Sequence, residues 1–227
     1  MRQIVLVSHG SPSDPAPLDA GLKAIAAGVQ VLCPHHQIRA ATLALPGALE
    51  AALSGFDAPE IYPFFMAEGW FTRRELPRRL ARAGVTARIL PPFGTEPELP
   101  GLIAKTVMDA TETAGLEPER ADLILVAHGS QVARRSKDTA QAMARRLRPL
   151  TRFWRIRTAF IEEAPFLADV AAESLSGLCL PFFAQRAGHV AEDIPAALAA
   201  AGFTGPRLPA IGEHPEAVAL IARSLMR

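Results

Sequence analysis

An internal duplication constrains the fold of this 227-residue chain more than any other feature of its sequence. Each half opens with an apolar run that leads into a His-Gly-Ser turn, and each contains a Pro-Phe-Phe segment further on. The matched segments follow in the same order in both halves: residues 4–11 with 124–130, 62–65 with 180–183, 75–77 with 193–195, and 92–97 with 210–215. Four matches in the same order rule out chance and indicate a repeated structural unit. We therefore predict two similar lobes, residues 1–115 and residues 116–227.

Short apolar runs alternate with amphipathic stretches in both halves. The apolar runs predict strands at residues 4–7, 38–43, 60–65 and 87–90, and at residues 123–127, 156–161, 178–183 and 207–210. The amphipathic stretches predict helices, among them residues 137–147, 166–175 and 191–201, and one that begins at Pro215. Strands separated by helices are typical of parallel sheets with helices on both faces, so the pattern predicts an α/β fold.

The composition excludes several classes of protein. Hydrophobic residues make up 49% of the chain, which is enough for a sizeable core. Lys and Arg number 24 against 23 Asp and Glu, so the charge gives no reason to expect nucleic acid or an anionic membrane as partner. No apolar run approaches the roughly 18 residues of a membrane helix, and polar Ser8 follows the first run too early for a signal peptide. We expect a cytoplasmic protein whose two cysteines, Cys33 and Cys179, are buried reduced thiols.

Three side chains of the second half stand where strands are predicted to end. His128 follows the first strand, Glu162 or Glu163 ends the second, and His189 lies in the loop after the third. In an open parallel sheet, ligands bind beyond the carboxyl ends of the strands, and a strand order of 2-1-3 would bring these side chains together. Two imidazoles and a carboxylate suit a divalent transition metal such as Co, Fe, Ni or Zn. A neutral imidazole is also well placed to accept a proton near pH 7.

The first half does not repeat this constellation. His9 matches His128, but Trp70 or Phe71 occupies the place of His189. The second strand of the first half ends in residues 44–46, which contain no carboxylate. The sequence therefore predicts a doubled scaffold with a single site in the second half, and His9 is expected to line a turn or a cleft wall.

Several segments of the chain resemble the class II tetrapyrrole metal chelatases, and most closely the sirohydrochlorin cobaltochelatase and ferrochelatase family. They are Val-Ala-His-Gly-Ser at 126–130, Ala-Phe-Ile-Glu at 159–162, Leu-Pro-Phe-Phe at 180–183 and Gly-His-Val-Ala-Glu-Asp-Ile-Pro at 188–195. The resemblance implies two tandem flavodoxin-like parallel-sheet lobes with a cleft between them. It implies insertion of a divalent metal into a tetrapyrrole without ATP or an organic cofactor. His128 and His189 would be the catalytic pair, and His128, Glu162 and His189 the metal ligands.

The resemblance also implies cationic side chains around the substrate, because sirohydrochlorin is a polycarboxylate. The candidates are Arg134, Arg135 and Lys137 after the second His-Gly-Ser turn, Arg186 before His189, and Arg73 and Arg74 in the first half. Backbone N–H groups at the helix start after the turn, with Ser130 among the candidate residues, can also hold a carboxylate.

Two alternative functions and several details stay open at this point. A histidine-phosphatase-type phosphohydrolase is disfavoured, because Ser8 and Ala127 stand where that chemistry needs arginine. A tetrapyrrole or metal carrier without turnover is compatible with the same residues. The sequence does not choose between Co, Fe and Ni or between cobalamin and siroheme biosynthesis, and it leaves the oligomeric state open, a homo-oligomer included.

Overall fold

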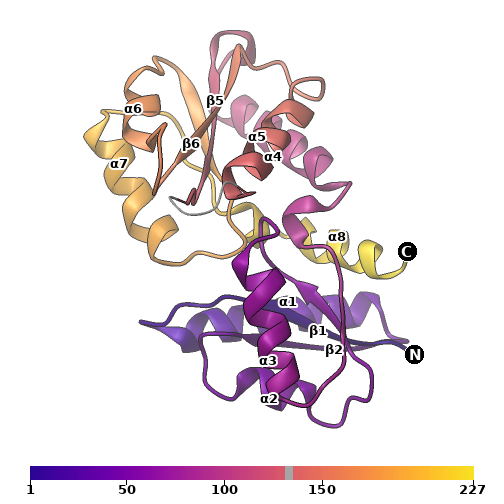
Figure 1. Cartoon of the computed structure of the whole chain (residues 1–227). Helices are drawn as coiled ribbons and strands as arrows, with labels where there is room; N and C mark the ends of the chain where they lie inside the picture. Colours follow the sequence, from indigo (N-terminus) through magenta and orange to yellow (C-terminus); the bar gives the residue numbers. More distant parts are fainter. Residues whose placement is uncertain (131–134) are drawn as a thin grey trace. The chain divides into compact units, whose positions relative to one another are not determined.

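The chain is described by a computed structural model that covers residues 1–130 and 135–227, without the side chain of Arg135. Its contacts divide the chain into two compact units, Met1–Glu96 together with Pro215–Arg227, and Pro97–His214. Each unit is built around one parallel sheet flanked by helices (Figure 1). The predicted α/β fold with two parallel sheets is confirmed. Among the described residues, no helix combines the length and apolar character required to span a bilayer.

Four parallel strands form the sheet of the first unit in the order β2-β1-β3-β4. The strands are β1 (Gln3–Ser8), β2 (Gln37–Thr42), β3 (Glu60–Pro63) and β4 (Arg88–Ile89). The helices are α1 (Pro15–Leu32), α2 (Ala48–Leu53), the π-helix η1 (Phe71–Glu75), α3 (Leu76–Arg82), the 3-10 helix η2 (Phe93–Thr95) and α8 (Glu216–Leu225). Val5 and Val7 of β1 pack with Leu49 of α2 and with Leu76 and Leu80 of α3, which gives this unit its own core.

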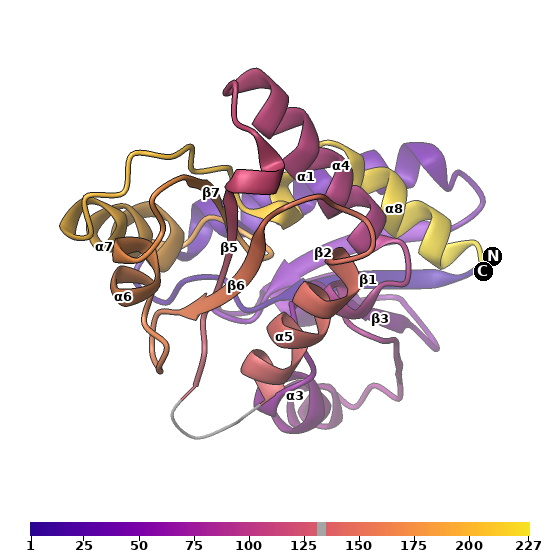
Figure 2. The same cartoon turned by 90° about the horizontal axis from the view of Figure 1, so that it is seen from above.

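Three parallel strands form the sheet of the second unit in the order β6-β5-β7 (Figure 2). The strands are β5 (Asp122–Ala127), β6 (Arg155–Phe160) and β7 (Gly177–Pro181). The helices are α4 (Leu99–Thr113), α5 (Arg135–Leu147), α6 (Leu167–Ala172), the π-helix η4 (His189–Asp193), α7 (Ile194–Ala200), and the 3-10 helices η3 (Pro118–Arg120) and η5 (Ile211–Glu213). Helices α6 and α7 lie on one face of the sheet and α4 and α5 on the other (Figure 1). All six residues of β5 are buried, because both faces of its sheet are covered.

Both sheets have the strand order 2-1-3 of a flavodoxin-like topology, which confirms the expected order. The strand predicted at residues 207–210 is wrong, because that segment makes only a single bridge between Cys179 and Arg207. The next backbone donor on β7 would be residue 181, and Pro181 has no N–H to donate. The ladder therefore stops after one bridge.

The last helix of each sequence half belongs to the compact unit of the other half. Helix α4, from the first half, packs on α5 and β7, whereas α8, from the second half, packs on α1. Buried Glu96 attaches the end of α8 to β3, since it accepts hydrogen bonds from Tyr62 Oη (2.9 Å), Arg227 Nη2 (2.6 Å) and Ser224 Oγ. Burial and the adjacent Glu96 carboxylate raise the pKa of Tyr62, so its hydroxyl remains a donor. The boundary near residue 115 thus marks the sequence repeat, while the packing boundaries follow Glu96 and His214.

Both cysteines are free thiols in the core, as expected from the sequence. Their exposed fractions are 3% for Cys33 and 0% for Cys179. Burial raises the pKa of the Cys179 thiol to about 12, so the reactive thiolate is scarce near neutral pH.

Candidate metal site

The turn after β5 positions the first candidate ligand, His128. Gly129 follows with a φ of +78°, in the left-handed region that favours glycine. A Cβ at this position would lie 2.9 Å from Glu163 Cγ and 3.0 Å from Phe160 Cβ, which leaves no room for a side chain. Glycine at position 129 is therefore required for the close approach of this turn to the end of β6. The His128 side chain is exposed just beyond the end of β5, and its Nδ1 lies 2.9 Å from Gly129 O.

Glu162 follows the end of β6 and reaches both imidazoles. Its backbone N–H donates to His128 O at 3.0 Å, which fixes the two strand ends side by side. In the side chain, Oε2 lies 3.8 Å from His128 Nδ1, and Oε1 lies 4.0 Å from His189 Nε2. The carboxylate thus lies between the two rings.

His189 is the first residue of the π-helix η4, which follows the loop after β7. Single-turn π-helical segments are rare and occur frequently at functional sites. The His189 ring meets the His128 ring edge-on, with 4.6 Å between centroids. Its Nδ1 lies 2.6 Å from Asp193 Oδ2, four residues later. Sequence reasoning missed this partner, although the spacing of four residues places both side chains on one helix face and could have revealed it.

The structure brings His128, Glu162 and His189 together as a cluster with metal-ligand geometry. One ligand atom from each residue lies within 4.8 Å of the others. Ligands at about 2.1 Å from one ion lie at most about 4 Å apart, so small side-chain rotations would bring all three ligand atoms within reach of one divalent ion. The side chains are 45%, 44% and 33% exposed, in the order given above. A cluster this open can release an ion and meet a bulky substrate.

Glu163, the alternative carboxylate, points away from the cluster. It accepts a hydrogen bond from Ser130 N at 2.9 Å and lies 3.5 Å from Lys137 Nζ. Lys137 also donates to Ala164 O at 2.7 Å. Glu163 therefore ties the turn that carries His128 to the loop that carries Glu162, and this geometry favours Glu162 as the ligand. The Ser130 N–H, expected from the sequence to hold a substrate carboxylate, donates to Glu163 instead.

Paired substitutions distinguish the two glutamates. Loss of an outer-shell partner of a metal ligand typically weakens metal binding by about 10- to 100-fold. Glu162→Gln removes a direct anionic ligand, so we expect it to weaken Co²⁺ binding by at least this much. Glu163→Gln should leave the Co²⁺ affinity nearly unchanged but lower the free energy of unfolding by about 1–3 kcal/mol, through weakened bonds to Ser130 and Lys137. Calorimetric Co²⁺ titration and thermal unfolding of both variants provide the measurement. A larger loss of Co²⁺ affinity in Glu163→Gln would reverse the assignment.

The predicted substrate-binding cations differ in exposure, and some of them lie outside the described residues. Arg134 lies outside the described residues, as does the side chain of Arg135. Arg186 is exposed in the loop before His189, and its backbone N donates to Glu213 Oε1 at 2.8 Å. In the first unit, Arg73 is exposed and pairs with Glu68. Of the predicted cations in the described part of the second unit, Arg186 has an exposed side chain, whereas Lys137 is partly buried.

The first unit repeats the backbone of the site without its ligands. Ala44 N donates to His9 O at 2.9 Å, as Glu162 N donates to His128 O, so Ala44 is the counterpart of Glu162. Phe71 opens the π-helix η1 as His189 opens η4, which decides between Trp70 and Phe71. The Phe71 ring packs 4.1 Å from the His9 ring, between centroids. The first unit thus has an aromatic contact where the second unit has the cluster of His128, Glu162 and His189.

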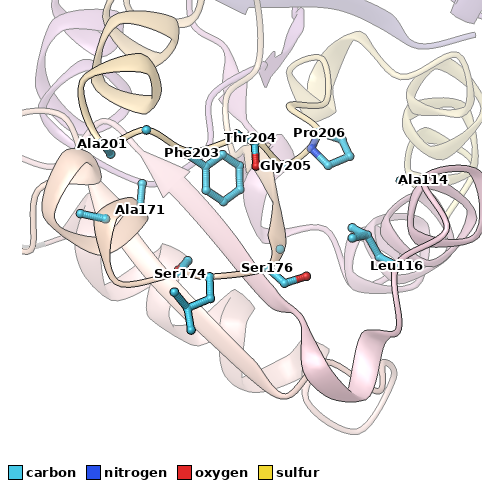
Figure 3. A pocket seen from close by; sticks show the side chains of 14 residues that line it. Ala114, Leu116, Ala171, Ser174, Ser176, Ala201, Phe203, Thr204, Gly205 and Pro206 are labelled. Atoms are coloured by element: carbon cyan, nitrogen blue, oxygen red, sulfur yellow. The ribbon is translucent and has the colours of Figure 1, made fainter.

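A cavity of about 560 Å³ lies in the second unit, near Gly177 at the start of β7 (Figure 3). It is therefore at the opposite end of the strand from the loop that carries His189. Small and apolar residues line it, with Phe203 and Leu116 among them, and none of the lining residues carries a charge. None of His128, Glu162 and His189 lines this cavity.

The parallel sheets and the two-histidine, one-carboxylate cluster at the strand ends define a chelatase-type α/β protein. A family model described as CbiX matches residues 3–110 and 122–227, so the chain belongs to the CbiX family. Family membership confirms the resemblance to sirohydrochlorin chelatases and argues against the histidine-phosphatase alternative.

A solved CbiX structure supports the same assignment. The structure of CbiX, the terminal enzyme for biosynthesis of siroheme in denitrifying bacteria, matches with a TM-score of 0.92 and 47% identity, covering 99% of this chain and 98% of that chain. SirB from Bacillus subtilis with Fe³⁺ matches with a TM-score of 0.76 and 17% identity, covering 100% and 95%. The sirohydrochlorin chelatase SirB from Bacillus subtilis subspecies spizizenii in complex with cobalt matches at 0.72 and 18%, covering 98% and 93%. At these identities, the SirB structures support the fold alone. A comparison with curated protein sequences gives no match.

Proposed function

We propose that this chain inserts a divalent metal ion, Co²⁺ or Fe²⁺, into sirohydrochlorin without ATP, in siroheme or cobalamin biosynthesis. The observation that carries the proposal is the cluster of His128, Glu162 and His189 at neighbouring strand ends. The 47% identity to a CbiX that is the terminal enzyme of siroheme biosynthesis supports the same reaction. We also propose a cytoplasmic location, to which the two free thiols are suited.

The cluster offers a route for both the metal and the protons. Two imidazoles and one carboxylate hold a divalent transition ion well, but they leave coordination positions open for incoming pyrrole nitrogens. Insertion of one divalent ion releases two pyrrole N–H protons, and the cluster contains two imidazoles. Each metal–imidazole bond that breaks frees a lone pair, which can accept one of these protons and pass it to water.

Glu162 and Arg186 have different proposed roles during metal insertion. The Glu162 carboxylate compensates part of the charge of the ion while the ion is held. Exposed Arg186 lies in the loop before His189 and is proposed to bind a carboxylate of the substrate.

The test is metallation of sirohydrochlorin by the purified full-length chain, followed by its absorption spectrum. We expect insertion of Co²⁺ or Fe²⁺ far faster than in the protein-free control, with substrate in excess so that several turnovers occur. Parallel runs with Co²⁺, Fe²⁺ and Ni²⁺ determine the preference, because imidazole and carboxylate accept all three ions. Equal rates with and without protein would rule out the enzymatic function, and stoichiometric binding without acceleration would identify a carrier.

A further inference from the structure

The Asp193 carboxylate determines which nitrogen of His189 carries a proton. Asp193 Oδ2 lies 2.6 Å from His189 Nδ1. An ionised carboxylate can only accept a hydrogen bond, so Nδ1 must donate and Nε2 keeps its lone pair. Nε2 is the nitrogen that lies 4.0 Å from Glu162 Oε1, inside the cluster. The hydrogen bond thus leaves the free lone pair on the side where the metal would bind.

A helix-capping role does not account for Asp193. An aspartate directly before a helix often caps its first backbone N–H groups. Asp193 precedes α7 directly but makes no side-chain cap hydrogen bond. Its side chain is 54% exposed, so packing does not explain its orientation either.

The first unit contains a natural comparison for this pair. Glu75 ends the π-helix η1, as Asp193 ends η4, but the ring at the start of η1 is Phe71, which has no N–H to donate. Glu75 is 5% exposed and instead pairs with Arg78 and Arg79. Its bond from Arg79 Nε, at 2.7 Å, lowers the pKa of Glu75. The carboxylate at this position thus contacts the ring in the unit where the ring is a histidine.

His128 is held differently. Its Nδ1 lies 2.9 Å from Gly129 O, and a carbonyl oxygen can only accept, so Nδ1 of the neutral ring donates there. The same nitrogen lies 3.8 Å from Glu162 Oε2, whereas His189 faces this carboxylate with Nε2. The arrangement in which a partner holds Nδ1 while Nε2 faces Glu162 is therefore that of His189.

We propose that Asp193 is a positioning residue that holds His189 in the tautomer with Nε2 unprotonated. Its contribution to metal insertion rests on the proposed function, whereas its effect on the ring can be measured on the protein alone. Metal-ligating histidines commonly donate their other ring N–H to a carboxylate, and loss of such a partner costs about 10- to 100-fold in metal affinity or activity.

Nuclear magnetic resonance of the imidazole nitrogens gives the direct test. In the neutral ring of the wild-type protein without metal, we expect the His189 proton on Nδ1. In Asp193→Ala, the same ring should become a mixture of both tautomers. Alanine is the best helix former, so this variant should fold. A wild-type His189 that is protonated on Nε2, or a tautomer unchanged in Asp193→Ala, would overturn the proposal.

Metal binding and kinetics give the second readout. We expect Asp193→Ala to weaken Co²⁺ binding by about 10- to 100-fold and to raise the KM for the metal, with little change in the KM for sirohydrochlorin. Glu192→Ala is the matched control, because it removes the same charge from an adjacent exposed position of the same π-helix. Equal loss of Co²⁺ affinity in both variants would show a general charge effect and overturn the positioning role. Failure of the wild-type protein to metallate sirohydrochlorin would contradict the proposed function, while the tautomer experiment would still decide this proposal.

Discussion

His128→Ala and His189→Ala are each expected to reduce metallation of sirohydrochlorin to nearly the uncatalysed rate. Each substitution removes one of the three proposed metal ligands and one of the two proposed proton acceptors. Loss of a positioned acid–base group alone typically lowers a rate by about 10²- to 10⁴-fold. The two rings are in contact, so the double variant should lose little beyond either single variant. Initial rates from the absorption spectrum, with Co²⁺ and with Fe²⁺, provide the measurement.

His9→Ala is the control for these variants, because His9 follows β1 as His128 follows β5. Its neighbours at the counterpart positions, Ala44 and Phe71, offer no metal ligand. We therefore expect His9→Ala to retain most of the activity. Activity lost in His9→Ala but kept in both second-unit variants would move the site to the first unit.

The combined substitution Ala44→Glu and Phe71→His is expected to create a second Co²⁺ site in the first unit. The backbone needed for such a site is already present, since Ala44 N–H bonds to His9 O and a π-helix begins at residue 71. The two new side chains would supply the carboxylate and the second imidazole beside His9. We expect this site to bind more weakly than the site of the second unit, by about 10- to 100-fold, because Glu75 is already paired with two arginines and cannot orient the new ring.

Co²⁺ stoichiometry is the measurement for this prediction. The pair of substitutions is introduced into the His128→Ala, His189→Ala background, where the natural site is removed. We expect one equivalent of Co²⁺ to bind to the four-substitution protein and none to the background, with Ala44→Glu alone as the control. Replacement of Phe71 removes apolar contacts to Phe65 and His9, at a cost of roughly 0.5–3 kcal/mol in unfolding free energy. A folded variant that binds no Co²⁺ would show that the backbone of the first unit does not preserve the site geometry.

Much of the fold could be predicted from the sequence, because it rests on local patterns. The alternation of apolar runs and amphipathic stretches predicted both parallel sheets, and the repeat predicted two similar lobes. The sequence repeat did not predict which unit each outer helix joins. Glu96 lies at the edge of the first unit, and its contacts to Ser224 and Arg227 at the end of α8 span more than a hundred residues of sequence. Such contacts depend on where distant elements meet, which no local pattern encodes.

The candidate site divides in the same way. The sequence by itself predicted that His128, a glutamate and His189 stand near the ends of consecutive strands, since His128 and Glu162 follow apolar runs directly and His189 lies in the loop after the third run. Only the tertiary structure decided that Glu162 joins the rings while Glu163 binds Ser130, that Phe71 is the counterpart of His189, and that Asp193 holds the His189 ring. The physical reason is direction: adjacent side chains point to different sides of a loop, and the surrounding turns determine which of them faces the cluster.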